Sequence, residues 1–108
     1  MEKDIWLEKF RREALPLIRY HIHPVKVVAF GSRIRGNATE ESDIDIIIIS
    51  DRFREIPFLE RMPWMLKHVP FPKHVDYLCY TPEEFERIKN TSSIIIDAMV
   101  EPLELAVS

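Results

Sequence analysis

The apolar residues of the first third of the chain recur at helical spacing and then give way to a short continuous run. Asp4 suits a helix N-cap, and one apolar stripe follows it at three- and four-residue steps: Leu7, Phe10, Ala14 and Leu17. Pro16 lies inside this stripe, so we expect the helix to kink or divide there. The segment from Val25 to Phe30 is short, apolar and rich in β-branched residues, which predicts a buried strand.

Two more strands are predicted in the middle of the chain, each with an acidic start. The segment Asp43–Ser50 has five isoleucines in eight positions, and both of its faces become apolar toward the C-terminal end. This pattern is typical of a central, covered strand that begins polar. The segment His74–Tyr80 predicts a third strand, in which Asp76 comes early.

Helix signals flank these strands. Residues 57–69 carry apolar positions at helical spacing, distorted by Pro63, and a short helical turn can form within residues 33–42. Thr81-Pro82-Glu83-Glu84 is a capping box that predicts a helix to about Lys89. Residues 92–100 predict another helix, and residues 103–107 either a closing strand or a docked tail. The resulting order, α-β-(loop)-β-α-β-α-α, predicts an α/β (α+β) fold with helices on a short mixed sheet.

Composition narrows the function classes. The 108 residues, 46% of them hydrophobic, predict one domain over residues 1–108. The net charge of −3 gives no general reason to bind nucleic acid directly, and no apolar run approaches the length that crosses a bilayer. The single cysteine, Cys79, lies in an apolar run and is interpreted as a buried structural thiol. Because the N-terminus also lacks a signal-peptide pattern, we expect a cytoplasmic protein.

Candidate chemistry is concentrated between the first two strands. Gly31-Ser32 closes the first strand with a turn whose N–H groups and hydroxyl can face a phosphate, and Asp43 and Asp45 share one face of the next strand. Two close carboxylates repel each other, and Mg²⁺ with its preference for oxygen ligands would relieve that repulsion. Asp76, on another strand, is the candidate third carboxylate of a two-metal site. Taken singly, the aspartates could merely terminate a sheet and Gly31-Ser32 could be an ordinary turn.

For most of the other polar and aromatic residues, the sequence indicates a structural role. The four histidines, at positions 21, 23, 68 and 74, show no recognised metal spacing and are interpreted as surface or core-edge residues. Trp6, Trp64, Phe58 and the methionines are interpreted as core and helix-packing residues. Arg33 and Arg35 either face a triphosphate or a partner, or are solvated loop residues.

These motifs resemble a known signature. Gly31-Ser32, ten intervening residues and then Asp43-Ile44-Asp45-Ile46 resemble the motif of the DNA polymerase β-type nucleotidyltransferase superfamily. The longer string FGSRIRGNATEESDIDI resembles the minimal nucleotidyltransferases, its only departure being Ile34 where those proteins have a small residue. The resemblance implies that Gly31 and Ser32 hold nucleotide phosphates, that Asp43 and Asp45 ligate Mg²⁺, and that Asp76 helps to activate the acceptor hydroxyl. Arg33 and Arg35 would then be nucleotide-binding residues.

The resemblance also implies a reaction and a partner. The reaction would be in-line attack of an acceptor hydroxyl on the α-phosphate of ATP, with release of pyrophosphate. Minimal nucleotidyltransferases are commonly encoded beside a small helical toxin of the HEPN class, so the resemblance implies that this chain is an antitoxin that modifies or binds such a partner. The alternatives are a non-catalytic nucleotide-binding module that neutralises its partner by binding, and a transferase for a small molecule such as an aminoglycoside. The last would need an acceptor pocket at a homodimer interface.

Overall fold

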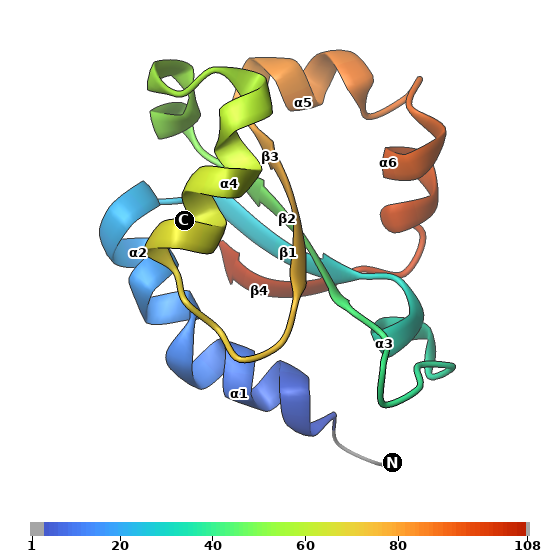
Figure 1. Ribbon diagram of the computed structural model, residues 1–108. Coiled ribbons are helices and arrows are strands. Elements are labelled where there is room, and N and C mark those ends of the chain that lie inside the picture. The colour runs from blue at the N-terminus through green and yellow to red at the C-terminus, as the bar shows by residue number, and fades with distance from the viewer. Residues whose placement is uncertain (1–3, 108) are drawn as a thin grey trace.

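Four strands form one mixed sheet in the order β3-β2-β1-β4 in the computed structural model, which describes residues 4–107 (Figure 1). The strands are β1 (Lys26–Phe30), β2 (Ile44–Ile49), β3 (Val75–Tyr80) and β4 (Leu103–Val107). The helices are α1 (Ile5–Glu13), α2 (Leu15–Ile22), α3 (Ser32–Arg35), α4 (Phe58–His68), α5 (Pro82–Ile88) and α6 (Ser93–Ala98), with a 3₁₀ helix, η1 (Asp51–Glu55). The predicted α/β class and the mixed sheet are confirmed.

The register of the two central strands sets the positions of the candidate site residues. β2 runs antiparallel to β1 and parallel to β3. Asp45 is therefore opposite Phe30 on one side and opposite Asp76 on the other. The alternative left open for residues 103–107 resolves as a strand, because β4 pairs antiparallel with β1 through a bulge.

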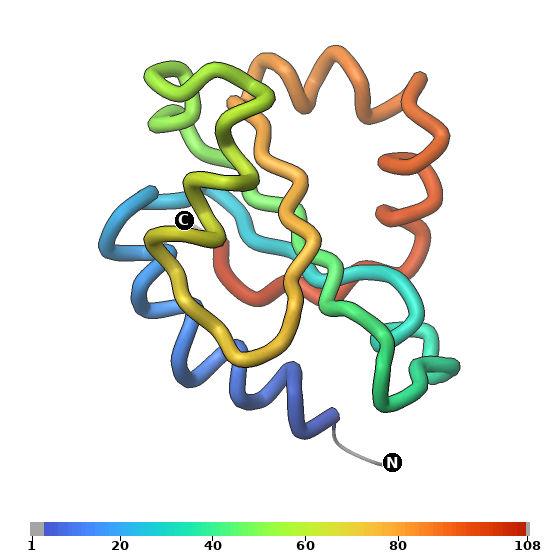
Figure 2. The backbone as a smooth tube through the Cα atoms, viewed as in Figure 1, coloured from blue at the N-terminus to red at the C-terminus, as the bar shows by residue number. Residues whose placement is uncertain are grey.

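The two faces of the sheet are covered differently. Helices α1, α2 and α4 lie against one face, where Ile44, Ile46 and Ile48 join the larger core cluster (Figure 1). The opposite face carries Ile47 and Ile49 and is covered by α5 and α6, which the tube in Figure 2 shows on the other side of the strands. Alternation along β2 and β3 places Asp45 and Asp76 on this second face. Within residues 4–107, no helix is long and apolar enough to cross a membrane.

Most local signals form the elements they predict. Asp4 caps α1 by accepting from two backbone N–H groups, and the helix divides at Ala14, just before Pro16. The capping box at Thr81 and Glu84 is present with both of its hydrogen bonds. Pro63 lies inside α4 and has no backbone N–H group, so it cannot donate the helical hydrogen bond to the carbonyl of Leu59. Leu59 is strongly exposed.

Two interpretations need correction or extension. Phe58, interpreted as a core residue, is 54% exposed, because it lies in the first turn of α4 outside the core and contacts the ring of Tyr80. Helix η1 has no counterpart in the prediction, although Ser50 caps it and Phe53 from it is fully buried. Cys79 is buried as predicted, and burial raises the pKa of its thiol to about 12.

Candidate active site

The turn between β1 and α3 depends on a glycine for two separate reasons. Gly31 has φ 83° and ψ −157°, a conformation that side-chain-bearing residues rarely adopt. A Cβ placed on Gly31 would also overlap the Oδ2 atom of Asp45. The backbone of the turn therefore lies directly against the carboxylate of β2, and Ser32 opens α3 immediately beside it.

The predicted carboxylates gather where β2 and β3 begin. Asp43 directly precedes β2, and the ligand atoms of Asp43, Asp76 and His74 all lie within 4.8 Å of one another. His74 Nε2 and Asp76 Oδ1 are hydrogen-bonded at 2.9 Å. Asp45 is directly opposite Asp76 in the parallel register, with its carboxylate turned toward Gly31. The structure thus brings together all three predicted aspartates.

The electrostatics of the group show that it holds excess negative charge. The pKa of Asp45 is raised from 3.8 to about 6, first by partial burial and then by the charges of Asp76 and Asp43. The nearby imidazole of His74 acts in the opposite direction and lowers it. A cation between these residues would remove the part of this shift that comes from repulsion and would favour the ionised carboxylate of Asp45.

The donor set fits a divalent metal ion. Asp43 and Asp76 offer carboxylate oxygens at close range, and Asp45, which is not part of that close group, lies opposite Asp76 as a further carboxylate. Carboxylate oxygens are the ligands that Mg²⁺ prefers. His74 adds a nitrogen, which is better suited to Mn²⁺ or Zn²⁺ than to Mg²⁺. The residues therefore fit the predicted metal, with one donor more than the sequence motif predicts.

His74 is the residue of this site that sequence reasoning missed. It is exposed, which agrees with its interpretation as a surface residue, but it also belongs to the carboxylate group. The available signal was its position two residues before Asp76, which puts both side chains on one face of a strand. By contrast, His21 and His68 contact the ring of Trp64 at the edge of the core, as predicted.

The two loop arginines are both engaged by carboxylates of the chain. Arg33 pairs with Asp4 at 3.0 Å and donates to backbone carbonyls, with only 6% of its side chain exposed. Arg35 is more exposed and pairs with Asp97 of α6 at 2.6 Å. Each already has a carboxylate partner within the chain, and their predicted contact with nucleotide stays a prediction.

A search among known proteins identifies the class to which this arrangement belongs. The sequence profile of the family described as "Nucleotidyltransferase domain" matches residues 6–101. The chain belongs to this family. It is 31% identical over 80 residues, 72% of this chain and 70% of the relative, to the Haemophilus influenzae protein named "Probable protein adenylyltransferase MntA".

A solved structure confirms the fold. A crystal structure from Sulfolobus solfataricus, of a protein assigned as a nucleotidyltransferase, matches with a TM-score of 0.54 and 23% identity. The match covers 96% of this chain and 89% of that one. Together these likenesses confirm the predicted resemblance to the minimal nucleotidyltransferases and the class of activity, enzymatic nucleotidyl transfer.

Proposed function

We propose that this chain transfers AMP from ATP, with Mg²⁺, to a hydroxyl group on a partner protein. The observation that carries the proposal is the convergence of Asp43, Asp45 and Asp76 beside the turn at Gly31-Ser32. A triphosphate needs both backbone donors and a metal held by carboxylates, and this end of the sheet offers the two together.

The proposed mechanism assigns each residue one task. Asp43 and Asp45 would hold Mg²⁺, and Asp76 would complete a second metal position on the acceptor side. The metal supplies neutralisation of the charge that develops on the phosphates. Gly31 lets the turn approach Asp45 closely, and Ser32 would contact the leaving phosphates. The acceptor oxygen would bond to the α-phosphorus as the bond to pyrophosphate breaks, and its proton would pass to Asp76.

The protein acceptor is proposed from the name of a relative and from the family resemblance, and not from the geometry of the site. The Haemophilus relative is named as a protein adenylyltransferase, which supports a protein acceptor. The resemblance to minimal nucleotidyltransferases adds that the partner would be a HEPN-type toxin and this chain its antitoxin, acting in the cytoplasm as a single domain. Such a partner would expose a hydroxyl-bearing side chain to the end of the sheet where β2 and β3 begin.

Calorimetric titration with Mg²⁺ and ATP tests the site. The wild-type chain should bind ATP in a Mg²⁺-dependent manner, and Asp45→Asn should weaken that binding because it removes a metal ligand while preserving shape. Asp76→Asn should impair transfer, measured as a mass gain of one AMP on the partner, more than it impairs ATP binding. Absence of Mg²⁺-dependent ATP binding by the wild-type chain, alone and with its partner, would refute the proposal.

One observation favours a second candidate, a module that neutralises its partner by binding alone. Arg33 and Arg35 are the only basic side chains in residues 31–42, and carboxylates of the chain occupy both. A triphosphate would then find no free cation in the loop. If Asp45→Asn protein neutralises the partner as well as the wild type does, binding without catalysis is the function.

A further inference from the structure

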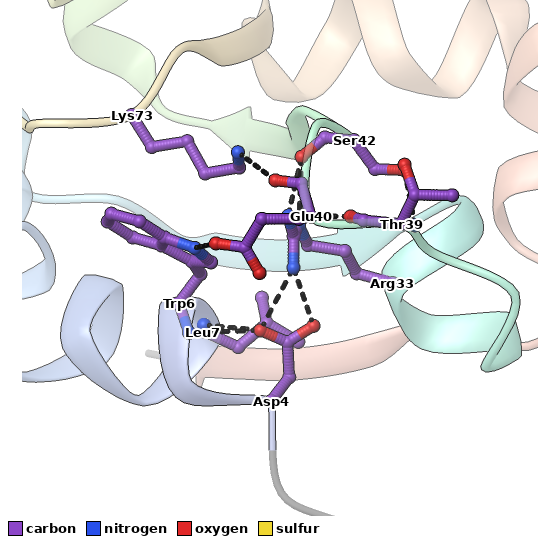
Figure 3. Close-up of polar contacts among 8 residues, drawn as sticks. All are labelled: Asp4, Trp6, Leu7, Arg33, Thr39, Glu40, Ser42 and Lys73. Carbon is purple, nitrogen blue, oxygen red and sulfur yellow. Dashed lines mark hydrogen bonds and ion pairs between the residues drawn. The ribbon is translucent and has the colours of Figure 1, made fainter.

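The N-terminal helix is joined to the candidate active site by a largely buried ion pair between Arg33 and Asp4, and Asp4 lies outside every site motif. Arg33 follows the Gly31-Ser32 turn, and its Nη1 atom donates to Oδ1 and Oδ2 of Asp4 at 3.2 and 3.0 Å (Figure 3). The side chains are 6% and 21% exposed, so water competes weakly for this pair. Asp4 and Arg33 are 29 residues apart, so the contact is tertiary.

The same guanidinium holds the backbone that leads into the first carboxylate. Nε and Nη2 of Arg33 donate to the carbonyl oxygen of Ser42 at 3.1 and 2.6 Å. Ser42 is the residue directly before Asp43, so this fork fixes the position from which the Asp43 side chain leaves the backbone. A lysine could not make this paired contact, because its ammonium group has no planar fork of donors.

Asp4 has a second task that explains why it is well placed to hold Arg33. Its Oδ1 atom also accepts from the backbone N–H groups of Trp6 and Leu7, as the N-cap of α1. The positive end of the helix dipole stabilises the carboxylate at this position. Helix α1 packs into the larger core through Phe10. Because the core holds α1 in place, Asp4 at its start is also held in place and can fix the position of Arg33.

Further contacts connect the segment that leads into β3 with the start of α1 and with the loop before Asp43. Trp6 donates from Nε1 to Glu40 Oε1 at 3.4 Å, and Lys73 donates to the Glu40 carbonyl at 2.8 Å (Figure 3). Lys73 directly precedes His74, where the chain enters β3. Lys73 Nζ also lies 5.2 Å from the centre of the Trp6 ring, so the start of α1 contacts both the loop before Asp43 and the segment before Asp76.

We propose that Asp4 is a positioning residue of the active site, which through Arg33 holds the loop of residues 36–42 so that Asp43 faces Asp76. This inference rests on the proposed function and gives Arg33 a structural task in place of a phosphate contact. Loss of such a supporting contact commonly weakens metal affinity about 10- to 100-fold, because the ligands must then be ordered by the ion itself.

The experiment compares Mg²⁺–ATP dissociation constants of four variants with that of the wild type. Asp4→Asn keeps the N-cap, since asparagine caps helices as well as aspartate does, but it removes the charge facing Arg33. Arg33→Lys keeps the charge and removes the fork to Ser42. Both should bind Mg²⁺–ATP about 10-fold more weakly. The double variant should be little worse than either single variant, because the two residues act through one contact.

Leu7→Ala is the matched control, because it removes packing from α1 and leaves Asp4 and Arg33 in place. It should lower the melting temperature yet keep Mg²⁺–ATP affinity within about twofold of wild type. Amide hydrogen exchange of the ligand-free proteins gives an independent measurement. In Asp4→Asn the N–H groups of Ser42 and Ile44, which donate to Thr39 and His74 carbonyls, should exchange faster.

The outcomes separate this inference from the proposed function. Wild-type affinity and unchanged exchange in Asp4→Asn and Arg33→Lys would overturn the positioning role and leave the nucleotidyltransferase assignment intact. Equal weakening in Leu7→Ala would also overturn it, since general destabilisation would then explain the effect. If the wild-type chain binds no Mg²⁺–ATP, with and without its partner, the proposed function fails and the inference fails with it.

Discussion

The two faces of the central sheet show how one strand can serve both stability and chemistry. On the face under α1, α2 and α4, β2 presents Ile44, Ile46 and Ile48, all with no exposed surface. On the other face the same strand begins with Asp45 and continues with Ile47 and Ile49. Alternation alone produces this difference, since neighbouring residues of a strand point to opposite sides.

The difference lies in how completely each face is covered. The larger core extends along the whole length of β2, whereas the smaller cluster under α5 and α6 covers only the end away from the carboxylates. Asp45 and Asp76 thus keep access to solvent while their neighbours on the strand are buried. One face of β2 is covered along its whole length, and the other leaves the carboxylates partly exposed to solvent.

The largest expected effect on stability comes from creating a cavity in the core between β2 and the helices α1, α2 and α4. Ile46→Ala should lower the free energy of unfolding by about 3 to 4 kcal/mol, because three helices prevent the cavity from closing. Ile47→Ala is the matched variant on the other face, also with no exposed surface. It should cost about 1 kcal/mol less, since the six-residue helix α6 can settle into the space. Urea denaturation measures both, and equal losses would show that the two faces are equally rigid.

A smaller effect is expected from a change that touches only the site face. Gly31→Ala should cost roughly 2 kcal/mol, because the conformation is strained for alanine and the new methyl group meets Asp45. Gly36→Ala is the control, since Gly36 also has a positive φ, 82°, but open space around the position of a Cβ. It should cost about 1 kcal/mol for conformation alone. If the two variants lose equal stability, the approach of the turn to Asp45 is not tight.

The covered face could be predicted from sequence more fully than the site face. The isoleucine run identified β2 and its two sides, and the capping box identified α5, because both signals are local. The grouping of His74 with Asp43 was not predictable, since it depends on the parallel register of β2 and β3. The pairing of Arg33 with Asp4 depends likewise on where α1 packs.

A change of pH should reveal the cost of ionising Asp45, which comes first from its partial burial and then from the charges of Asp76 and Asp43. The pKa of Asp45 is raised to about 6 in the folded chain, so the folded state binds the proton more tightly than the unfolded state. The stability this proton provides is fully present below about pH 4 and is lost as the pH rises through 6. The shift corresponds to about 3 kcal/mol at most, and partial solvation reduces this to roughly 1 to 2 kcal/mol.

Asp45→Asn should therefore stabilise the metal-free protein by roughly 1 to 2 kcal/mol at pH 8, with the gain shrinking toward zero near pH 4. Urea denaturation of both proteins across this range, in EDTA, measures the difference. Mg²⁺ should then narrow the gap at pH 8 by stabilising only the wild-type protein. A gain that does not depend on pH would show that the ionisation of Asp45 is not its cause.

The smallest expected effect concerns the ion pair between Arg35 of α3 and Asp97 of α6. Arg35 and Asp97 are both well exposed, so Asp97→Asn should lower the free energy of unfolding by less than about 0.5 kcal/mol, and 1 M NaCl should abolish the difference. If Arg35 contacts the triphosphate as the sequence predicts, the substitution frees it from its competitor and should tighten Mg²⁺–ATP binding about two- to threefold. Asp51→Asn, which disturbs another exposed arginine pair far from the loop, should leave that affinity unchanged. Weaker ATP binding in Asp97→Asn would instead mean that α6 must hold Arg35 in place for the site to form.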